Sequence, residues 1–494
     1  MSDTLAPPPS VSEAFRLYRD GRPDAALATL TATGSGAEAH AAGQLLLGAL
    51  ALERRQSAAA AAAFRRSAAL DPGFGRAYSN LAVTLRRTNR LEPALAAANR
   101  ALLLEPGHRQ VLNARAATLV DMDRPGDALT DAEAVLSGAW DDHEAAVNRG
   151  LALHRLGRLD EARAVLDEAV RRRPDDPIAR NAWAHLLLLL GEMPLGWRER
   201  EARWLLPIGL SLTALPDVPL WNGEPLAGRT ILVVGDEGRG DMIQYLRLLD
   251  LPCFAGARIA LQVPSYMVRL FAAAYPSVRV TGRTPDGPFD FQTPLSRVPA
   301  IAGLRLDTIP PNTPYLRADP ERVGFWRSRI GDDGFRIAVC WQGNPATLVD
   351  RGRSFPLAEF APLAAVPGVR LIALQARHGT EQLAQLPAGM TVETLGDDYD
   401  TDPDSFVDPA AVAEVADLVV SSDTALAHLA GALGRPTWVA LRKVPDFRWL
   451  LDREDSPWYP TVRLFRQRTE GDWAEVMQRI AAAVRRRMAD SPEP

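Results

Sequence analysis

Cysteine, strong net charge and long apolar runs are all scarce in this chain of 494 residues. Its two cysteines, Cys253 and Cys340, stand far apart in apolar sequence, which argues against a disulfide framework or a metal-binding spacing. A net charge of −5 exerts no general attraction on nucleic acid or anionic membranes. The run Leu186–Leu190 is far too short to span a bilayer, and no basic segment followed by an apolar one opens the chain. We therefore expect a cytoplasmic protein with no membrane span and no nucleic-acid partner.

A repeat of 34 residues runs through the first part of the chain. One column at this spacing holds only alanine, a second holds only alanine or glycine, and a third is mostly proline. Small residues let paired helices approach closely and proline ends a helix, so the pattern resembles the tetratricopeptide repeat. The columns are Ala26, Ala60, Ala94, Ala128 and Ala162; Ala14, Gly48, Ala82, Ala116 and Gly150; and Pro72, Pro106 and Pro174, with Trp140 breaking the third. The repeats are framed as 7–40, 41–74, 75–108, 109–142 and 143–176.

The segments that flank these five repeats, which together span residues 7–176, have patterns of their own. Residues 1–6 are expected to form a flexible tail, and residues 177–204 a divergent sixth helix pair that caps the array. Residues 205–228 lack a clear period and are interpreted as a linker that packs against its neighbours. The aromatic residues expected in the cap are Trp183, Trp197 and Trp204.

An array of this kind offers a groove that holds an extended polypeptide. Asparagine amides on such a groove can bond a peptide backbone whatever its side chains are, and the candidates are Asn80, Asn113, Asn148 and Asn181. The alternative is that the array is a passive spacer.

Strand and helix patterns alternate from residue 229 onward, which predicts parallel sheets with crossover helices. The proline-rich segment 309–315 is interpreted as a break between an N-terminal lobe, 229–318, and a C-terminal lobe, 319–494, that ends in a helix. The strands are predicted at 230–234, 258–263, 278–281, 289–292, 336–341, 369–374, 417–420 and 437–441.

A glycine-rich turn follows the first of these strands. Its spacing, Gly235-x-x-Gly238-x-Gly240, does not match the dinucleotide fingerprint, and the acidic pair Asp236-Glu237 would repel a phosphate. We therefore expect this loop to hold an acid or base, with Asp241 as the candidate. The alternative is that Asp241 only caps the next helix.

Residues 421–436, SSDTALAHLAGALGRP, combine cap-type residues with strong helix formers and a glycine–proline stop after a buried strand. The free N–H groups at such a helix N-terminus attract anions, although capped strand–turn–helix units without a ligand are common. Loops at the ends of two other predicted strands carry Gln342–Asn344 and Gln375, and the cations Arg351 and Arg353 follow closely. Because ligands bind at the carboxyl ends of parallel strands, this convergence favours an anion site.

The pattern S-x-D-T-x-x-x-H-L-A-x-A-L-G-x-P, read here from Ser421 to Pro436, resembles the signature of heptosyltransferase-type glycosyltransferases (glycosyltransferase family nine), and Gly240-Asp241 resembles that family's N-terminal motif. The order of domains is also similar to that of O-linked N-acetylglucosamine transferases and of repeat-bearing flagellin glycosyltransferases. Five further segments are typical of bacterial proteins that join tetratricopeptide repeats to such a domain: WNGEPLAG (221–228), WQGNP (341–345), DRGRS (350–354), DTALAHLAGALGRP (423–436) and SPWYPTVRLFRQ (456–467).

This resemblance implies a GT-B fold, two Rossmann-like lobes facing across a cleft, with no obligatory metal, no cofactor and a nucleotide-sugar as co-substrate. It implies that Asp241 is the general base and that the C-terminal lobe binds the donor. The implied donor-binding residues are Gln342, Gly343, Asn344, Arg351, Arg353, Gln375, Ser422, Asp423, Thr424 and His428. The family has a glycine where Ala425 stands and a lysine where this chain has arginines, so we do not expect the sugar to be heptose.

Three functions remain open on the sequence. The first is an inverting glycosyltransferase that modifies Ser or Thr side chains of a polypeptide, such as flagellin, recruited by the array. The second transfers the sugar to a lipid-linked or polysaccharide glycan. The third is a scaffold or chaperone whose transferase lobes are inactive.

Overall fold

The protein is described by a computed structural model that covers residues 7–32, 36–138, 141–206, 215, 217–401 and 405–490. Its chain divides into two compact units, residues 1–169 and 170–494. The expected tail, 1–6, and the Trp140 position of the proline column lie outside the described residues.

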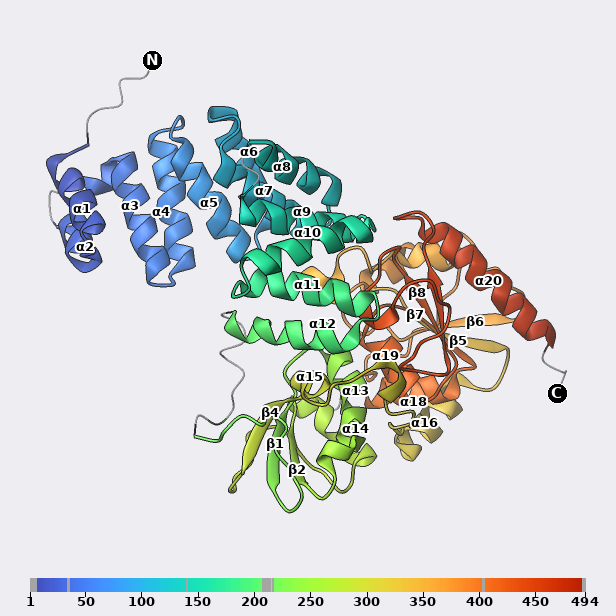
Figure 1. Ribbon diagram of the computed structural model, residues 1–494. Helices are drawn as coiled ribbons and strands as arrows, with labels where there is room; N and C mark the ends of the chain where they lie inside the picture. Colours follow the sequence, from blue (N-terminus) through green and yellow to red (C-terminus); the bar gives the residue numbers. More distant parts are fainter. Residues whose placement is uncertain are drawn as a thin grey trace. The chain divides into compact units, whose positions relative to one another are not determined.

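The first unit is a stack of antiparallel helix pairs (blue to green in Figure 1), each with its partner one short turn away. The alanine column is fully buried at all five positions, since a larger side chain there would separate the helices of a pair. The helices are α1 (Pro9–Arg19), α2 (Pro23–Thr31), α3 (Ala41–Glu53), α4 (Ser57–Leu70), α5 (Gly75–Arg87), α6 (Leu91–Leu104), α7 (Arg109–Asp121), α8 (Pro125–Gly138), α9 (His143–Arg155) and α10 (Leu159–Arg172).

The two glycines of the second column mark the closest approaches within pairs. A Cβ atom on Gly48 would lie 2.4 Å from the Phe64 ring, and one on Gly150 would lie 2.5 Å from Leu166. Each glycine therefore makes room for the large side chain of the following helix, which is why this column admits only small residues.

The sixth helix pair, α11 (Pro177–Leu189) and α12 (Met193–Arg200), belongs to the second unit. Trp197 is buried and packs edge-on against Tyr245 and Phe447, with ring centroids 6.3 and 5.6 Å apart. The expectation that this pair serves as a cap for the array is therefore too narrow, because its apolar side chains form part of the core of the α/β unit.

The second unit contains two parallel sheets. The first has the strand order β3-β2-β1-β4 and the second has the order β6-β5-β7-β8-β9. Each sheet has one point where the direction of the strand order reverses. This point lies between β1 and β4 in the first sheet and between β5 and β7 in the second. Loops at the carboxyl ends of strands on either side of such a point form a crevice that can bind a ligand. The strands are β1 (Thr230–Val234), β2 (Arg258–Gln262), β3 (Arg279–Thr281), β4 (Phe291–Pro294), β5 (Phe335–Cys340), β6 (Val369–Ala373), β7 (Leu418–Ser422), β8 (Thr437–Leu441) and β9 (Val462–Arg466).

Helices connect and cover these strands. One face of the second sheet packs against α17, the turn before it and α20, of which α20 is red in Figure 1. Phe360, Val476 and Ile480 are among the side chains in this contact. The α-helices that follow β1 in the chain are α13 (Arg239–Leu246), α14 (Val268–Ala274), α15 (Val298–Ile301), α16 (Pro320–Ile330), α17 (Ala361–Ala364), α18 (Val407–Val415), α19 (Ala425–Ala432) and α20 (Trp473–Asp490). None of the helices in the described part of the chain combines the length and apolar character that a membrane crossing requires.

Strand β9 and helix α16 are among the elements that were not predicted from the sequence. Strand β9 includes Arg463 and Arg466, which interrupt the apolar pattern. The Arg463 guanidinium lies over the Phe465 ring of the same strand, and Arg466 donates to the Leu450 carbonyl at 2.8 Å. Helix α16 is only weakly apolar, and it is held by burial of Trp326, whose indole donates to Asp408 at 2.8 Å.

The linker packs on the first sheet over residues 217–228. Trp221 is buried there, and its backbone N–H donates to the Gln292 carbonyl. Residues 207–214 and 216 of the linker lie outside the described part of the chain.

Candidate active site

A cavity of about 890 Å³ lies in the second unit, and both lobes line it. The loop after β1 contributes residues Glu237 to Asp241, and the loops after β5, β6 and β7 contribute most of the remainder. Both reversals of strand order therefore frame the same space. Nine sequence-predicted site residues line it: Asp241, Gln342, Gly343, Asn344, Arg353, Gln375, Asp423, Thr424 and His428.

The N-terminus of α19 faces this cavity. Thr424 is its N-cap residue by position, but its side chain makes no cap hydrogen bond. Its hydroxyl instead lies 3.1 Å from the Ser421 hydroxyl and 3.6 Å from the Cys340 sulfur. Thr424, Ala425 and Leu426 all line the cavity, so the positive end of the helix is directed at a ligand space instead of being closed by a cap.

Gln375 holds two strand-end loops together. Its side-chain oxygen accepts from the N–H groups of Trp341 and Gln342 at 3.3 and 3.1 Å, and its nitrogen donates to the carbonyls of Gln342 and His378. Gln375 lines the cavity, yet its side-chain amide is hydrogen-bonded to backbone groups of the two loops. Its place in the site is therefore to shape the loop that contains Gln342–Asn344.

The loop after β5 is folded around Asp350. Ser354 donates to Asp350 at 2.7 Å and accepts from the Gly343 N–H at 2.9 Å, and a Cβ on Gly343 would lie 2.2 Å from the carboxylate. Arg353 lies 3.7 Å from Asp350 and also lines the cavity. Of the predicted cation pair, the structure thus brings Arg353 to the site.

Two predicted donor residues, Arg351 and Ser422, are not among the residues that line the cavity. Arg351 accepts a hydrogen bond from Arg442 through its carbonyl, and Ser422 is fully buried at the end of β7. The assignment of Arg351 and Ser422 to donor binding therefore remains a prediction from the sequence.

His428 lies one turn into α19. Its Nδ1 is 2.9 Å from the Tyr459 hydroxyl, and its ring stacks on Trp449 with centroids 5.2 Å apart. Burial, reinforced by the positive charge of Arg448, lowers the pKa of His428 to about 3, so the ring is neutral at pH 7. His428 is thus a fixed, uncharged wall of the cavity.

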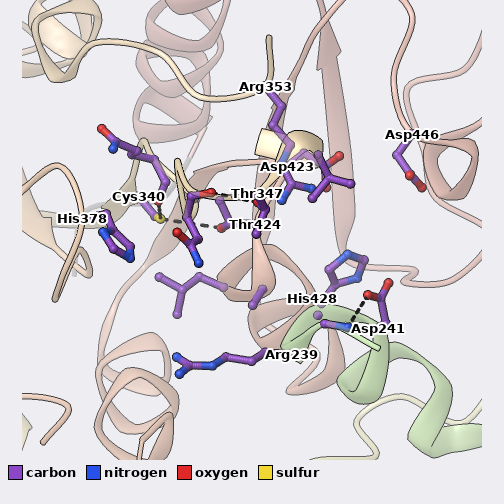
Figure 2. A pocket seen from close by; sticks show the side chains of 18 of the residues that line it. Arg239, Asp241, Cys340, Thr347, Arg353, His378, Asp423, Thr424, His428 and Asp446 are labelled. Atoms are coloured by element: carbon purple, nitrogen blue, oxygen red, sulfur yellow. Dashed lines mark hydrogen bonds between the residues drawn. The ribbon is translucent and has the colours of Figure 1, made fainter. Parts of the chain in front are cut away.

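Asp241 is both a helix cap and part of an ion pair. One carboxylate oxygen accepts from the Gly238 N–H at 2.9 Å, the bond drawn in Figure 2, and the other accepts from the Arg448 guanidinium. Burial and the nearby carboxylates Glu237 and Asp446 raise the pKa of Asp241, although Arg448 opposes them. The two interpretations of Asp241 from sequence are therefore compatible, because a capped carboxylate at this place still borders the cavity.

Arg448 is the centre of a charged network that joins the lobes. It donates to Asp446 at 2.7 Å, to Gln244 at 2.6 Å and to the Tyr245 hydroxyl at 3.2 Å. Burial opposes ionisation of Asp446, but Arg448 outweighs it and holds the pKa of that carboxyl well below its usual range. No sequence pattern pointed to Arg448.

The carboxylates of the acidic turn 236–237 form ion pairs with arginines of α12 and of the helical turn that follows it. Glu237 is 2.6 Å from Arg200 and also pairs with Arg203, while Asp236 accepts from the N–H and hydroxyl of Ser296. Burial opposes the charge on Glu237, but the guanidinium groups of Arg200, Arg203 and Arg448 lower its pKa to about 2. The turn is consequently a structural ion-pair site. Burial and the neighbouring charge of Glu237 also raise the pKa of Asp236, to about 6, but Asp236 is held by Ser296 and is not among the residues that line the cavity, whereas Asp241 lines it.

Several lining residues carry no local sequence signal. They come from segments far apart in the chain, and include His185, Arg200, Arg239, Tyr266, Arg377, Phe406, Asp446 and Arg448. Cys340 is buried and also borders the cavity. Among the residues that the structure describes, no cluster of three or more His, Cys, Asp or Glu side chains is arranged to hold a metal ion.

The asparagines expected on the groove of the array do not form one exposed row. Asn113 and Asn148 are 3% and 5% exposed, and the Asn148 amide donates to the Asn113 carbonyl at 3.2 Å. The Asn113 amide donates to Asp142. These two side chains tie neighbouring helices together, so the prediction that they bind a peptide is corrected. Asn80 and Asn181 are partly exposed, Asn181 within the second unit.

Comparison with known proteins agrees with this division of the chain. Residues 45–109 and 113–177 match the family model of the tetratricopeptide repeat. Protein FlbA of Caulobacter vibrioides (strain ATCC 19089 / CIP 103742 / CB 15) is 28% identical over 475 residues, which cover 89% of this chain and 77% of FlbA. That similarity extends beyond the repeats into the α/β unit, since the repeats account for less than half of the chain.

Several solved structures of repeat proteins match part of the chain. A tetratricopeptide repeat protein from Parabacteroides merdae ATCC 43184 is 16% identical with a TM-score of 0.35, and the match covers 41% of this chain and 82% of that one. YrrB, a repeat protein with an unusual peptide-binding site, is 20% identical with a TM-score of 0.32, covering 36% and 91%. PilF of Pseudomonas aeruginosa is 16% identical with a TM-score of 0.33, covering 40% and 91%. The chain is thus a tetratricopeptide-repeat array followed by two parallel-sheet α/β lobes, with FlbA as a distant homologue.

Proposed function

We propose that this protein is an inverting glycosyltransferase that moves a sugar from a nucleotide-sugar to a Ser or Thr hydroxyl of a polypeptide recruited by the repeats. The observation that carries the proposal is the meeting of two features across one cavity. The uncapped N-terminus of α19 borders it on the C-terminal lobe, and the carboxylate of Asp241 borders it on the N-terminal lobe. The first suits an anionic leaving group and the second suits a base.

The transfer itself requires two changes of bonding at the anomeric carbon. The acceptor oxygen forms a bond to that carbon while the bond from the carbon to the phosphate oxygen breaks, and the electron pair stays on the phosphate. The hydroxyl proton passes to Asp241, whose raised pKa improves its match to this task. Arg353 and the N–H groups at the start of α19 stabilise the charge that develops on the leaving nucleotide.

The choice of a protein acceptor follows from the array. Stacked tetratricopeptide repeats form extended surfaces that bind polypeptides, and the chain joins such an array directly to the α/β unit. A surface polypeptide such as flagellin is our proposed acceptor, on the resemblance of the whole layout to flagellin glycosyltransferases. A glycan acceptor would leave the array without a substrate to bind.

Two measurements test the proposal. A thermal-shift screen of nucleotide-sugars with the full chain should reveal a donor, since a ligand present at 100 times its Kd stabilises by about 2.7 kcal/mol. The donor found is then incubated with enzyme and purified flagellin, and intact-mass analysis should show mass increments of one sugar. A screen with no binder would favour the scaffold function, and a donor that modifies glycans but no polypeptide would favour the glycan-directed transferase.

A further inference from the structure

Arg239 is the first residue of α13 and lines the cavity from the N-terminal lobe. Figure 2 shows Arg239 and Asp241 pointing in different directions from the start of that helix. The two side chains therefore serve different parts of the cavity. Asp241 belongs to the Arg448 network, and Arg239 does not.

The guanidinium of Arg239 is held by aromatic rings from both lobes. Its central carbon lies 4.4 Å from the centroid of Tyr266 in the N-terminal lobe and 5.5 Å from that of Phe406 in the C-terminal lobe. Such contacts use the face of the guanidinium and leave the N–H groups at its edge available. Within the described ranges, no hydrogen bond or ion pair engages these N–H groups.

Other charged groups near Arg239 do not take up its donors. Asp400 lies close enough for Arg239 and Arg377 to act on its charge, but burial is the stronger effect and raises the pKa of Asp400. One oxygen of that carboxyl already accepts the Phe406 N–H at 2.6 Å. Arg239 thus lines the cavity without a hydrogen-bonded carboxylate partner among the residues that the structure describes.

The start of α13 lies directly against the start of α19. A Cβ on Gly240 would be 2.8 Å from the His428 ring and 3.3 Å from the Cα of Ala425. Arg239 directly precedes Gly240, and both Arg239 and the uncapped first turn of α19 line the cavity.

We propose that Arg239 binds a phosphate of the leaving nucleotide from the N-terminal lobe, opposite the α19 N-terminus. This inference rests on the proposed function and adds a residue to it. When the anomeric carbon–oxygen bond breaks, the phosphate oxygen keeps the electron pair, and Arg239 stabilises the added charge through charge-assisted hydrogen bonds. Donor binding consequently draws on both lobes, and the ring contacts with Tyr266 and Phe406 keep the guanidinium in place before the donor arrives.

The test is calorimetric titration of the full chain with CMP, ADP, GDP, UDP and dTDP, comparing the wild type with Arg239→Gln and Arg239→Lys. For the nucleotides that bind the wild type, Arg239→Gln should weaken binding roughly tenfold or more, and Arg239→Lys should recover part of the loss. The matched control is Arg463→Gln, which removes a guanidinium stacked on Phe465 at 4.9 Å but outside the cavity, and it should bind as the wild type does. Melting temperatures of all variants report whether each folds.

The outcomes separate the two proposals. Wild-type binding that Arg239→Gln leaves unchanged overturns the role of Arg239 and spares the proposed function. A loss of affinity for the intact nucleotide-sugar without a loss for the free nucleotide also overturns it, because the residue would then contact the sugar. A wild type that binds no nucleotide and no nucleotide-sugar removes the proposed function itself.

Discussion

The Asp241 side chain has three sets of contacts. It caps the N-terminus of α13, it pairs with Arg448 of the other lobe, and it borders the cavity. An ion pair with Arg448 favours the charged form, while burial and the carboxylates of Glu237 and Asp446 favour the neutral form. The balance leaves the pKa raised, and it depends on groups contributed by both lobes.

Asp241→Asn should therefore remove transfer and keep the fold. The amide oxygen can still accept from the Gly238 N–H, but the side chain cannot take a proton, so the transfer rate should fall by about 100-fold or more. Donor affinity should stay close to that of the wild type. Asp307→Asn, at a carboxylate that is 71% exposed and pairs with Arg305, is the control. Transfer at the wild-type rate by Asp241→Asn would remove this residue from the chemistry.

His428 makes a prediction for stability against pH. Its pKa of about 3 in the folded protein lies below the unfolded value of about 6.5. The unfolded chain therefore binds a proton that the folded chain does not, and stability present above pH 6.5 is lost as the pH falls toward 3. Each such group contributes about 1.4 kcal/mol per pH unit within that window.

Unfolding by urea, followed by tryptophan fluorescence, measures this slope in the second unit because ten of the eleven tryptophans lie in residues 170–494. His428→Gln should reduce the slope between pH 6 and 4.5 by about one proton. Burial also lowers the pKa of His185, to about 4, so His185 contributes to the same pH dependence of stability, and that contribution should persist in His428→Gln. His378→Gln, at an exposed ring, is the control, and an equal slope in His428→Gln and wild type would contradict the burial argument.

At the scale of elements, the site depends on how closely α13 and α19 approach. Gly240 is the contact point, and any Cβ there meets the His428 ring and the backbone of Ala425. Backbone cannot move aside as a flexible side chain can, so the two helices must separate.

Gly240→Ala should accordingly destabilise the second unit by about 1–3 kcal/mol and weaken nucleotide binding, even though alanine is the better helix former. Gly324→Ala in α16 is the matched control, because nothing lies within 4 Å of a Cβ there. That control should raise stability by about 0.5–1 kcal/mol. Urea midpoints and nucleotide titrations measure both, and a gain of stability in Gly240→Ala would show that the helices tolerate the methyl group.

At the scale of the whole molecule, the chain forms two compact units with separate cores. The core of the array is built from small alanine columns together with large side chains such as Phe64, Leu81 and Leu85, whereas the core of the second unit packs helices on sheets. A substitution or ligand that affects the core or site of one unit should then shift the unfolding transition of that unit and leave the other transition unchanged.

Calorimetry of the full chain tests this independence. Gly48→Ala places a Cβ 2.4 Å from the Phe64 ring and should lower only the transition of the array. A saturating nucleotide should raise only the transition of the second unit. Gly126→Ala, with open space around its Cβ in α8, controls for the added methyl group in the array. A single transition that shifts under both treatments would mean that the units unfold together.

The sequence by itself determined the repeat period, eight of the nine described strands and the strand-end loops that reach the cavity, because periodicity and cap residues act over a few neighbouring positions. It placed Asp241, Arg353, Asp423, Thr424 and His428 at one site through loops that meet at sheet edges.

Only the tertiary structure decided which charges meet. Arg448 lies 207 residues from Asp241, and Arg239 meets Phe406 from the opposite lobe. The same holds for the sixth helix pair, whose pattern resembles a repeat but whose Arg200 stabilises the acidic turn of the N-terminal lobe. Long-range pairs leave no trace in local periodicity, because the partner of a buried charge is chosen by packing and not by distance along the chain.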